Sequence, residues 1–337
     1  HRTMTVYAGI DIGTGGVRGV CLDSELEVLH QTARSYEVHS PEPGWAQQDP
    51  DEIVSAVRAV MEEIVASFPA RSAADELVLA LSSVMHSLIA VDAEGMPVSP
   101  MLIWADNRAI RETKWLEREF GIDAFYRTTA CPLHPSFWPG KIIWLGREVG
   151  RERIARYVSI KEYLLHRVTG MWIVDTSVAA GSGLFDLTEQ RFDGDLLAAL
   201  SVSEEKFSRP VSTTHTVDVE ISGRTVPLVV GATDGVLANL GIGAVTPDTA
   251  VITAGSSTAV RLTTPAPVFD GEHRTWCYPL DDDRYVVGEA SNSGGLVLNW
   301  LADMMGFDSA EAMAAELLPE VPYEPVDALF LPTLSGE

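Results

Sequence analysis

The sequence predicts an α/β protein made of two related halves, and three observations lead to this prediction. Apolar runs of strand length, such as 77–81 and 226–230, alternate with segments whose apolar residues follow helical spacing, such as 53–64. Such alternation is typical of sheets covered by helices. A hairpin-like pattern also occurs twice, near the start of the chain and again in its last third. The 337 residues are enough for two domains with cores of their own.

The repeated pattern is a short apolar strand, a turn of Gly, Ser and Thr, and a second apolar run. It covers 6–18 and 250–261. Such turns expose backbone N–H groups and hydroxyls, which suits a phosphate, although either turn alone is also consistent with an ordinary hairpin. Asp11 follows the first apolar run, where a metal ion or its water would stabilise a carboxylate. Neither turn has the glycine spacing and lysine of a Walker loop, nor a dinucleotide fingerprint.

Helix and strand signals follow in order along the chain. Asp49 can cap a helix that has Pro50 at its first position, with Glu52 in capping-box spacing. A strand is predicted over 77–81, and the short segment that follows it ends at Met85 and His86. Further predicted elements are helices over 108–120, from 141, over 292–305 and over 309–318, and a strand over 226–230. The halves should meet near 224–227, giving domains of 4–226 and 227–337.

Composition limits the classes of partner. A net charge of −24 argues against nucleic acid and anionic membranes, which require basic surface. It does not exclude an anionic substrate, which responds to local charge. Three scattered cysteines predict a reducing, cytoplasmic setting, and no apolar run approaches the ~20 residues of a membrane helix. We therefore expect a cytoplasmic protein that binds a small molecule, and a homodimer is compatible with this expectation.

Asp234 is the strongest catalytic candidate. It follows the apolar run 226–230 and directly precedes Gly235. A carboxylate at the end of a strand can face a cleft and accept the proton of a hydroxyl that attacks phosphorus. A cap for a helix over 236–240 is an equally good interpretation, and the two roles are compatible.

Two further segments are candidates for binding hydroxyl groups. Met85 and His86 follow a strand, where a lone histidine is more often structural. Asp106, Asn107 and Arg108 follow Trp104, and polar groups beside an aromatic wall suit a sugar, although Asp106 or Asn107 could instead cap a helix. The stretch 136–145 is rich in aromatic residues and contains Lys141. This stretch could equally be a loop that leads into a core helix.

Taken together, these motifs resemble the FGGY carbohydrate kinases of the actin and hexokinase superfamily. Seven motifs occur in the family's order, at 11–14, 44–50, 85–86, 104–108, 141–145, 231–235 and 255–257. Within the family, the segments 104–108, 159–163 and 233–241 are most similar to gluconate kinases. Xylulose kinases are similar too, but they usually have Asn at the position of Gly235.

The resemblance implies two ribonuclease-H-like domains around a cleft, with ATP and Mg²⁺ as cofactors. Family members continue past the segment 332–337, so the second domain is expected to be incomplete in this chain. Asp234 corresponds to the catalytic base, and Asp11 to the residue that holds Mg²⁺ through water. The implied substrate contacts are Met85, His86, Asp106, Asn107 and Asp234. The implied nucleotide or phosphate contacts are Thr14, Gly15, Gly16, Arg18, Gly255, Ser256, Ser257, Gly294, Gly295 and Asn299.

The implied function is ATP-dependent phosphorylation of a sugar or sugar acid, with D-gluconate giving 6-phosphogluconate as the leading expectation. A pentulose kinase of the xylulose type is the alternative within the family. A non-catalytic sugar sensor on the same scaffold is the alternative from another class, although such a binder needs neither Asp234 nor Asp11. A substrate carboxylate requires a local cation, for which Arg108, Lys141 and Lys161 are the candidates.

Overall fold

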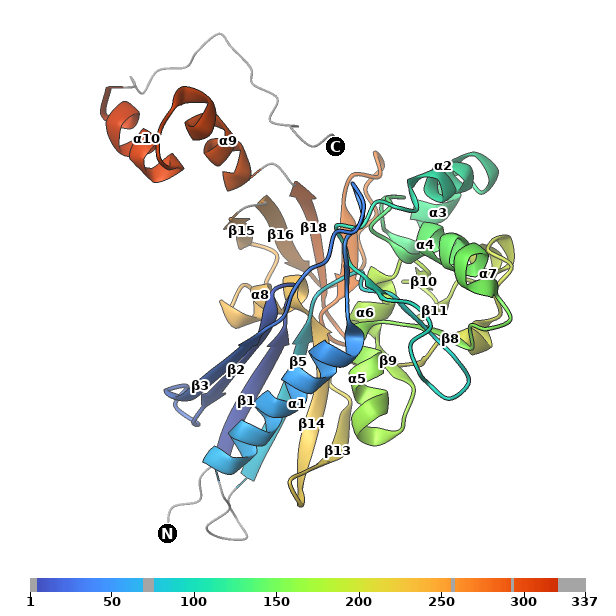
Figure 1. The fold of residues 1–337 in the computed structure, drawn as a ribbon, viewed down its shortest axis with the longest axis horizontal. Coiled ribbons are helices and arrows are strands. Elements are labelled where there is room, and N and C mark those ends of the chain that lie inside the picture. The colour runs from blue at the N-terminus through green and yellow to red at the C-terminus, as the bar shows by residue number, and fades with distance from the viewer. Residues whose placement is uncertain (1–4, 69–75, 256–257, 292–293, 321–337) are drawn as a thin grey trace.

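A computed structural model describes the chain over residues 5–68, 76–255, 258–291 and 294–320. It contains two main sheets, joined by a helix that lies between them (Figure 1). The first sheet has the strand order β13-β14-β5-β1-β2-β3. Its strands are β1 (Thr5–Ile12), β2 (Gly16–Leu22), β3 (Val28–Ser35), β5 (Glu76–Ser83), β13 (Thr216–Ile221) and β14 (Arg224–Thr233).

Strand direction in the first sheet brings the candidate residues to one edge. β1, β2 and β3 form an antiparallel meander, while β5 runs parallel to β1, and β14 runs parallel to β5. The carboxyl ends of β1, β5 and β14 therefore lie side by side. In β1 every second residue is buried, as expected for a strand with one face on a core.

A glycine allows β14 to bend at this edge. The register between β14 and β5 shifts between Val229 and Ala232. Gly231 has a φ of +68°, and a Cβ there would overlap the carbonyl oxygen of Leu81. Only glycine fits this left-handed position against a neighbouring backbone. The bulge thus sets the direction in which the chain leaves β14 toward Asp234.

Helices cover the first sheet and build a second layer beside it. α1 (Pro50–Ser67) packs on β2 and β3 next to α5 (Ile160–Thr169), and Asp49 caps α1 as predicted. A helical layer lies to the right in Figure 1. It comprises α2 (Ile110–Glu119), α3 (Ile122–Thr129), α4 (Trp138–Leu145) with a π-helical turn (Gly146–Gly150), α6 (Thr176–Gly181), α7 (Gly194–Ala199) and a 3₁₀ turn (Glu204–Lys206).

Short strand pairs connect these helices. They are β4 (Gln47–Gln48) with β7 (Met101–Leu102), β6 (Ile89–Val91) with β8 (Arg156–Val158), β9 (Ile173–Asp175) with β12 (Arg209–Val211), and β10 (Phe185–Asp186) with β11 (Arg191–Phe192). The predicted helix over 108–120 corresponds to α2, and the helix predicted from 141 begins three residues earlier as α4.

The second sheet is antiparallel throughout, in the order β15-β16-β18-β17. α8 (Asp234–Gly241) contacts β5 and β14 of the first sheet and β16 of the second. The other elements are β15 (Ala250–Ala254), β16 (Thr258–Thr264), β17 (Trp276–Pro279), β18 (Tyr285–Ser291), α9 (Gly295–Met305), α10 (Ala310–Leu317) and a 3₁₀ turn (Leu318–Glu320). Of the predicted helix over 292–305, residues 292 and 293 lie outside the described residues.

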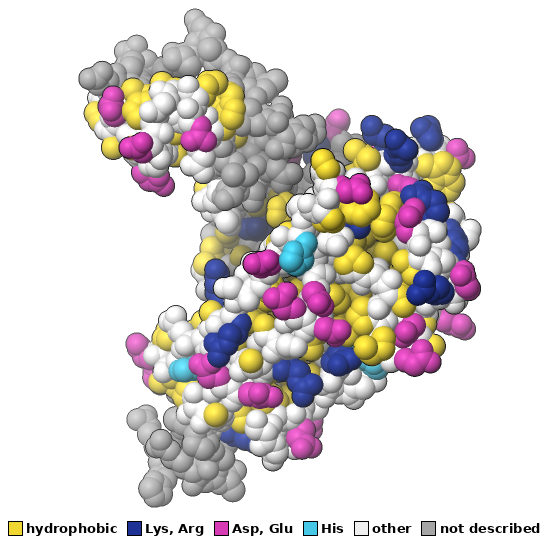
Figure 2. Space-filling view, viewed as in Figure 1, with side chains coloured by type: hydrophobic (Ala, Val, Ile, Leu, Met, Phe, Trp, Pro, Cys, Tyr) yellow, Lys and Arg dark blue, Asp and Glu magenta, His cyan; other side chains and the backbone are white. Residues whose placement is uncertain are grey.

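The two halves differ from the predicted division in one respect. The expected boundary between 226 and 227 falls inside β14, all of which extends the first sheet through its pairing with β5 or β13. Asp234 therefore follows a strand of the first sheet, and the second sheet begins only at Ala250. In the space-filling view the surface is hollowed between the lobe of α9 and α10 and the lobe of the first sheet (Figure 2).

Candidate active site

Asp234 stands where the two sheets approach each other. It is the first residue of α8, and its Oδ1 accepts a hydrogen bond from the Gly235 amide at 2.7 Å. The pKa of Asp234 is raised to about 6: burial and the nearby Asp11 carboxylate raise it, and the Gly235 amide, Arg261 and Lys161 partly offset them. The cap position belongs to Thr233, so the alternative role of Asp234 as helix cap is not seen. A half-buried carboxylate with this pKa can act as a base near neutral pH.

Asp11 lies near the end of β1, two strands away from β14. Its Oδ1 accepts a hydrogen bond from the Ser82 hydroxyl of β5 at 2.7 Å. Ser82 was not among the predicted residues, although it directly precedes the Ser83–His86 stretch. The second carboxylate oxygen suits Mg²⁺, which proteins often hold through one or two carboxylates together with water and nucleotide phosphates.

Side chains from other parts of the chain hold the first Gly-rich turn in place through hydrogen bonds. Tyr36 donates its hydroxyl to the Gly13 carbonyl at 2.6 Å, and Gln48 Nε2 donates to the Thr14 carbonyl at 2.8 Å. Trp104 Nε1 donates to the Thr14 hydroxyl at 3.1 Å. Within the described part of the chain, the Thr14 and Gly15 amides have no acceptor. The turn therefore offers N–H groups rather than carbonyls to a ligand, as a phosphate requires.

The second turn meets the start of α9. Gly255 accepts a hydrogen bond from the Gly295 amide at 2.6 Å, so Gly294 and Gly295 lie beside this turn. Asn299 is exposed on α9. Ser256 and Ser257 lie outside the described residues. In the first hairpin, Gly16 begins β2, and Arg18 is an exposed residue opposite Asp11.

Met85 lies next to the start of α8, and His86 follows it in the chain. A Cβ on Gly235 would collide with the Met85 methyl group. His86 has a φ of +61°, its ring lies 4.5 Å from that of Phe137, and its Nδ1 is 2.7 Å from the Gly181 carbonyl. Burial lowers the pKa of His86 to about 3. The neutral ring must donate from Nδ1 to this carbonyl, so Nε2 is left as an acceptor for a hydroxyl.

The structure gives Asp106 a different role from the predicted direct sugar contact. The residue is fully buried, and its oxygens accept hydrogen bonds from the Ala46 amide at 2.7 Å and from Arg108 Nε at 2.8 and 2.9 Å. It holds Arg108 and the segment before β4 in place. Asp106 and Asn107 do not cap α2 either, because the cap position is Ala109. Asn107 is exposed and remains available to a ligand.

The three candidate cations for a substrate carboxylate are all engaged by the protein. Arg108 pairs with Asp106 at 2.8 Å, and its guanidinium lies 3.9 Å from the Trp45 ring centroid. Lys161 pairs with Asp175 at 2.7 Å and donates to the Ala232 carbonyl at 2.9 Å.

Lys141, the third of these cations, donates to three carbonyls, those of His86, Ile103 and Ser136. Burial lowers its pKa to about 7. All three cations thus bind carboxylates or carbonyls of the protein itself. The expectation that one of them binds a substrate carboxylate is therefore not supported.

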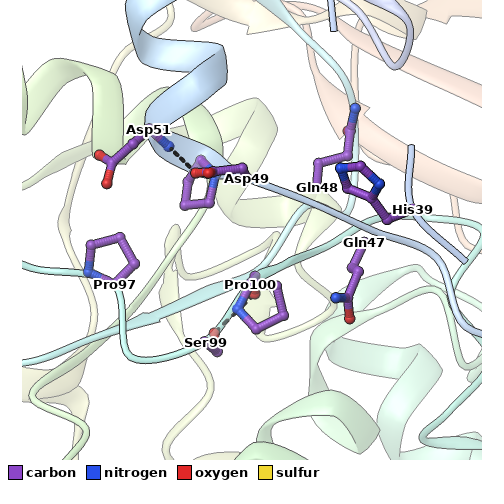
Figure 3. Close-up of a pocket in the computed structure, with 9 residues that line it drawn as sticks. His39, Gln47, Gln48, Asp49, Asp51, Pro97, Ser99 and Pro100 are labelled. Carbon is purple, nitrogen blue, oxygen red and sulfur yellow. Dashed lines mark hydrogen bonds between the residues drawn. The ribbon is translucent and has the colours of Figure 1, made fainter. Parts of the chain in front are cut away.

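A pocket of about 370 Å³ lies beside the start of α1 (Figure 3). Its lining includes His39, Gln47, Asp49, Pro97 and Ser99, and none of the predicted site residues. In Figure 3 the side chains of Gln47 and Gln48 point to opposite sides of their strand. Gln48 braces the Thr14 turn, and the Gln47 oxygen accepts from Arg108 at 2.8 Å. The pocket is thus linked to the site through β4 but does not contain it.

No helix in the described ranges is long and apolar enough to span a membrane. Besides Ser82, a second site residue that was not predicted is Arg261 of β16, which lies against Gly235. It is part of the repeated pattern, but its place beside the base depends on the contact between α8 and β16.

Comparison with known proteins agrees with this geometry. Residues 6–241 match the N-terminal domain of the FGGY family of carbohydrate kinases. A gluconokinase from Bacillus subtilis is 32% identical over 360 residues, covering 99% of this chain and 69% of that protein. A xylulose kinase from Escherichia coli is 28% identical over 345 residues, covering 98% of this chain and 69% of that protein.

Comparison with solved structures also identifies carbohydrate kinases as similar proteins. The crystal structure of gluconate kinase from Lactobacillus acidophilus matches with a TM-score of 0.91 and 26% identity, covering 99% of this chain and 69% of that one. The predicted fold class is therefore confirmed. The remainder of each of these relatives has no counterpart in this sequence.

Proposed function

The chain belongs to the FGGY family of carbohydrate kinases, and on this premise we propose that it phosphorylates D-gluconate with ATP to give 6-phosphogluconate. The observation that carries the proposal is the half-buried Asp234 carboxylate, which directly precedes Gly235 and the adjacent Met85 methyl group, with the Asp11 carboxylate close enough to raise its pKa. A base, a hydroxyl-binding group and a metal-binding carboxylate thus converge at one edge of the first sheet.

In the proposed reaction the substrate hydroxyl oxygen attacks the γ-phosphorus of ATP. A new O–P bond forms, the bond to the β,γ-bridging oxygen breaks, and ADP leaves. The hydroxyl proton passes to the Asp234 carboxylate. His86 Nε2 and Asn107 orient the substrate. Asp11 would hold Mg²⁺ through water, and the bound ion would supply neutralisation of the phosphate charge.

The nucleotide phosphates would lie between the two Gly-rich turns. The amides of Thr14 and Gly15, which have no acceptor among the described residues, are donors from the first turn. Gly255, Gly294 and Gly295 meet on the opposite side, and the exposed Asn299 follows on α9. Arg18, Gly16, Ser256 and Ser257 complete the proposed set. Division of the chain into a sugar-binding first domain and a second domain with the second turn is part of this proposal.

Xylulose is the alternative substrate, and one observation disfavours it. Gly235 leaves room for Met85, and an Asn side chain there would have to displace the Met85 methyl group. The non-catalytic sensor is the less favoured function, because binding alone explains neither the raised pKa of Asp234 nor the Asp11–Ser82 contact.

A coupled ADP-release assay with the full-length enzyme tests the proposal. Gluconate, xylulose, ribulose and glycerol are compared at equal MgATP, and we expect kcat/KM to be highest for gluconate. Higher kcat/KM for xylulose would favour the pentulose kinase. Sugar binding without ADP release for any of them would favour the sensor.

A further inference from the structure

We propose that Arg261 forms an oxyanion site beside the base, which binds either the carboxylate of a sugar acid or the phosphoryl group in transfer. The inference rests on the proposed function and adds to it the residue that receives the substrate's negative charge. Arg261 belongs to the second sheet, whereas Asp234 follows the first, so the site forms only where the two sheets meet.

The guanidinium of Arg261 faces the first turn of α8. A Cβ built on Gly235 would lie 3.6 Å from Arg261 Nε and 3.8 Å from Nη2. The Nε–Nη2 edge of the guanidinium therefore faces the position that a side chain at 235 would occupy. Because residue 235 is glycine, no side chain at that position lies against this edge.

The opposite side of the guanidinium is anchored. Nη1 donates a hydrogen bond to the Thr253 hydroxyl on β15 at 2.8 Å. Nε is buried and has no hydrogen-bond partner among the described residues. A buried donor without an acceptor is expensive, and such a donor next to a catalytic base is well placed to bind a ligand atom. Nε and Nη2 together match the two oxygens of a carboxylate or phosphoryl group.

The charge of Arg261 is not neutralised by a direct partner. Within the described ranges, no carboxylate lies within ion-pair distance of it, in contrast to Arg108 with Asp106 and Lys161 with Asp175. The positive charge of Arg261 near Asp234 creates the local field that an anionic ligand requires.

A comparison of a charged with an uncharged substrate distinguishes the two possible ligands of Arg261, the substrate carboxylate and the phosphoryl group. Arg261→Met removes the charge, and Arg261→Lys keeps the charge but loses the two-donor edge. Each variant is assayed with gluconate and with xylulose, the uncharged comparison, in the full-length enzyme. Arg274→Gln is the matched control, since Arg274 is an exposed arginine of the same half that pairs with Asp270.

Binding of the substrate carboxylate predicts at least a tenfold rise in KM for gluconate in Arg261→Met and less than twofold for xylulose. Binding of the phosphoryl group predicts at least a tenfold fall in kcat for both substrates at unchanged KM, with partial rescue by added guanidinium. Changes of less than twofold on both substrates would overturn the proposal. If Arg261→Met does not fold, Arg261→Lys decides by the same criteria.

The failure of this inference is distinguishable from that of the proposed function. If the unaltered enzyme releases no ADP with gluconate, the proposed substrate is wrong. The variants are then measured on the sugar that is phosphorylated, where a tenfold loss of kcat still supports the oxyanion site. An unchanged kcat there would overturn it.

Discussion

The two hairpins that carry the same sequence pattern differ in how the protein supports them. β1 and β2 pair up to Ile12 and Val17, and β15 and β16 pair up to Ala254 and Thr258, so both are antiparallel hairpins as predicted. In β1 alternate residues are buried, whereas only Val251 is buried in β15. The first hairpin thus belongs to a packed core, and the second has most of its surface uncovered.

Large apolar side chains of the second half are also exposed to solvent. Ile252 is 69% exposed, and Met304 on α9 is 62% exposed. Apolar atoms cover much of the visible surface of α9 and α10 (Figure 2). Asp234 and Asp11 therefore belong to the more closely packed half, while Arg261 and the second turn belong to the half with less packing. We expect mutations in the first half to change folding stability and those in the second to change association.

The largest expected effect comes from the buried ion pair behind Asp234. Lys161→Met leaves Asp175 buried and without its cation, which should destabilise the fold by about 3–5 kcal/mol. Urea unfolding measures the change. Combining it with Asp175→Asn, which keeps an acceptor for the Val178 amide, should recover more than half of the loss. A loss below about 1 kcal/mol in the single variant would show that the pair does not support this edge.

Exposed apolar residues of the second half should make residues 1–337 self-associate. Replacing Ile252 and Val260, which are 69% and 43% exposed, by Ser and Thr should weaken association about tenfold to a hundredfold. Sedimentation velocity over a range of concentrations measures this. Leu26→Ser is the matched control, because Leu26 is 72% exposed in the first half and should have no effect. A monodisperse monomer at all concentrations would contradict the prediction.

The ionised carboxylate of Asp234 should lower the free energy of unfolding of the first half. The pKa of Asp234 is about 6 in the fold, against an ordinary value of 3.8, so the folded state loses stability as pH rises through this range. Asp234→Asn removes that loss and should stabilise the fold by about 1–2 kcal/mol at pH 8. Below about pH 3 the gain should vanish, because the carboxyl is then protonated in both states. Thermal unfolding at the two pH values tests this, and an equal gain at both would contradict it.

The smallest effect concerns the pH dependence of turnover. Since the base must be ionised, kcat should rise with pH and reach half its maximum near pH 6. Removing the positive charge of Arg261 by substitution to Gln disfavours the ionised carboxylate, so this midpoint should move to higher pH. A midpoint near pH 4 in the unaltered enzyme would contradict the raised pKa of Asp234.

The predictable parts of the fold and site were those that depend on local sequence. The strand before Gly231 and the cap at Asp49 both follow from neighbouring residues. The partners of Lys141 and Lys161 are not local, because they include the carbonyls of Ile103 and Ala232. A lysine near a site motif therefore resembles a ligand-binding cation in sequence, even when distant carbonyls already use its donors.

The central claim is that Asp234 accepts the proton of the substrate hydroxyl. In Asp234→Asn we expect kcat to fall by about 10²–10⁴, the usual contribution of a general base, while calorimetry shows nearly unchanged gluconate binding. Both measurements use the full-length enzyme at pH 8, where the carboxylate is ionised. Turnover close to that of the unaltered enzyme, with intact gluconate binding, would contradict the account.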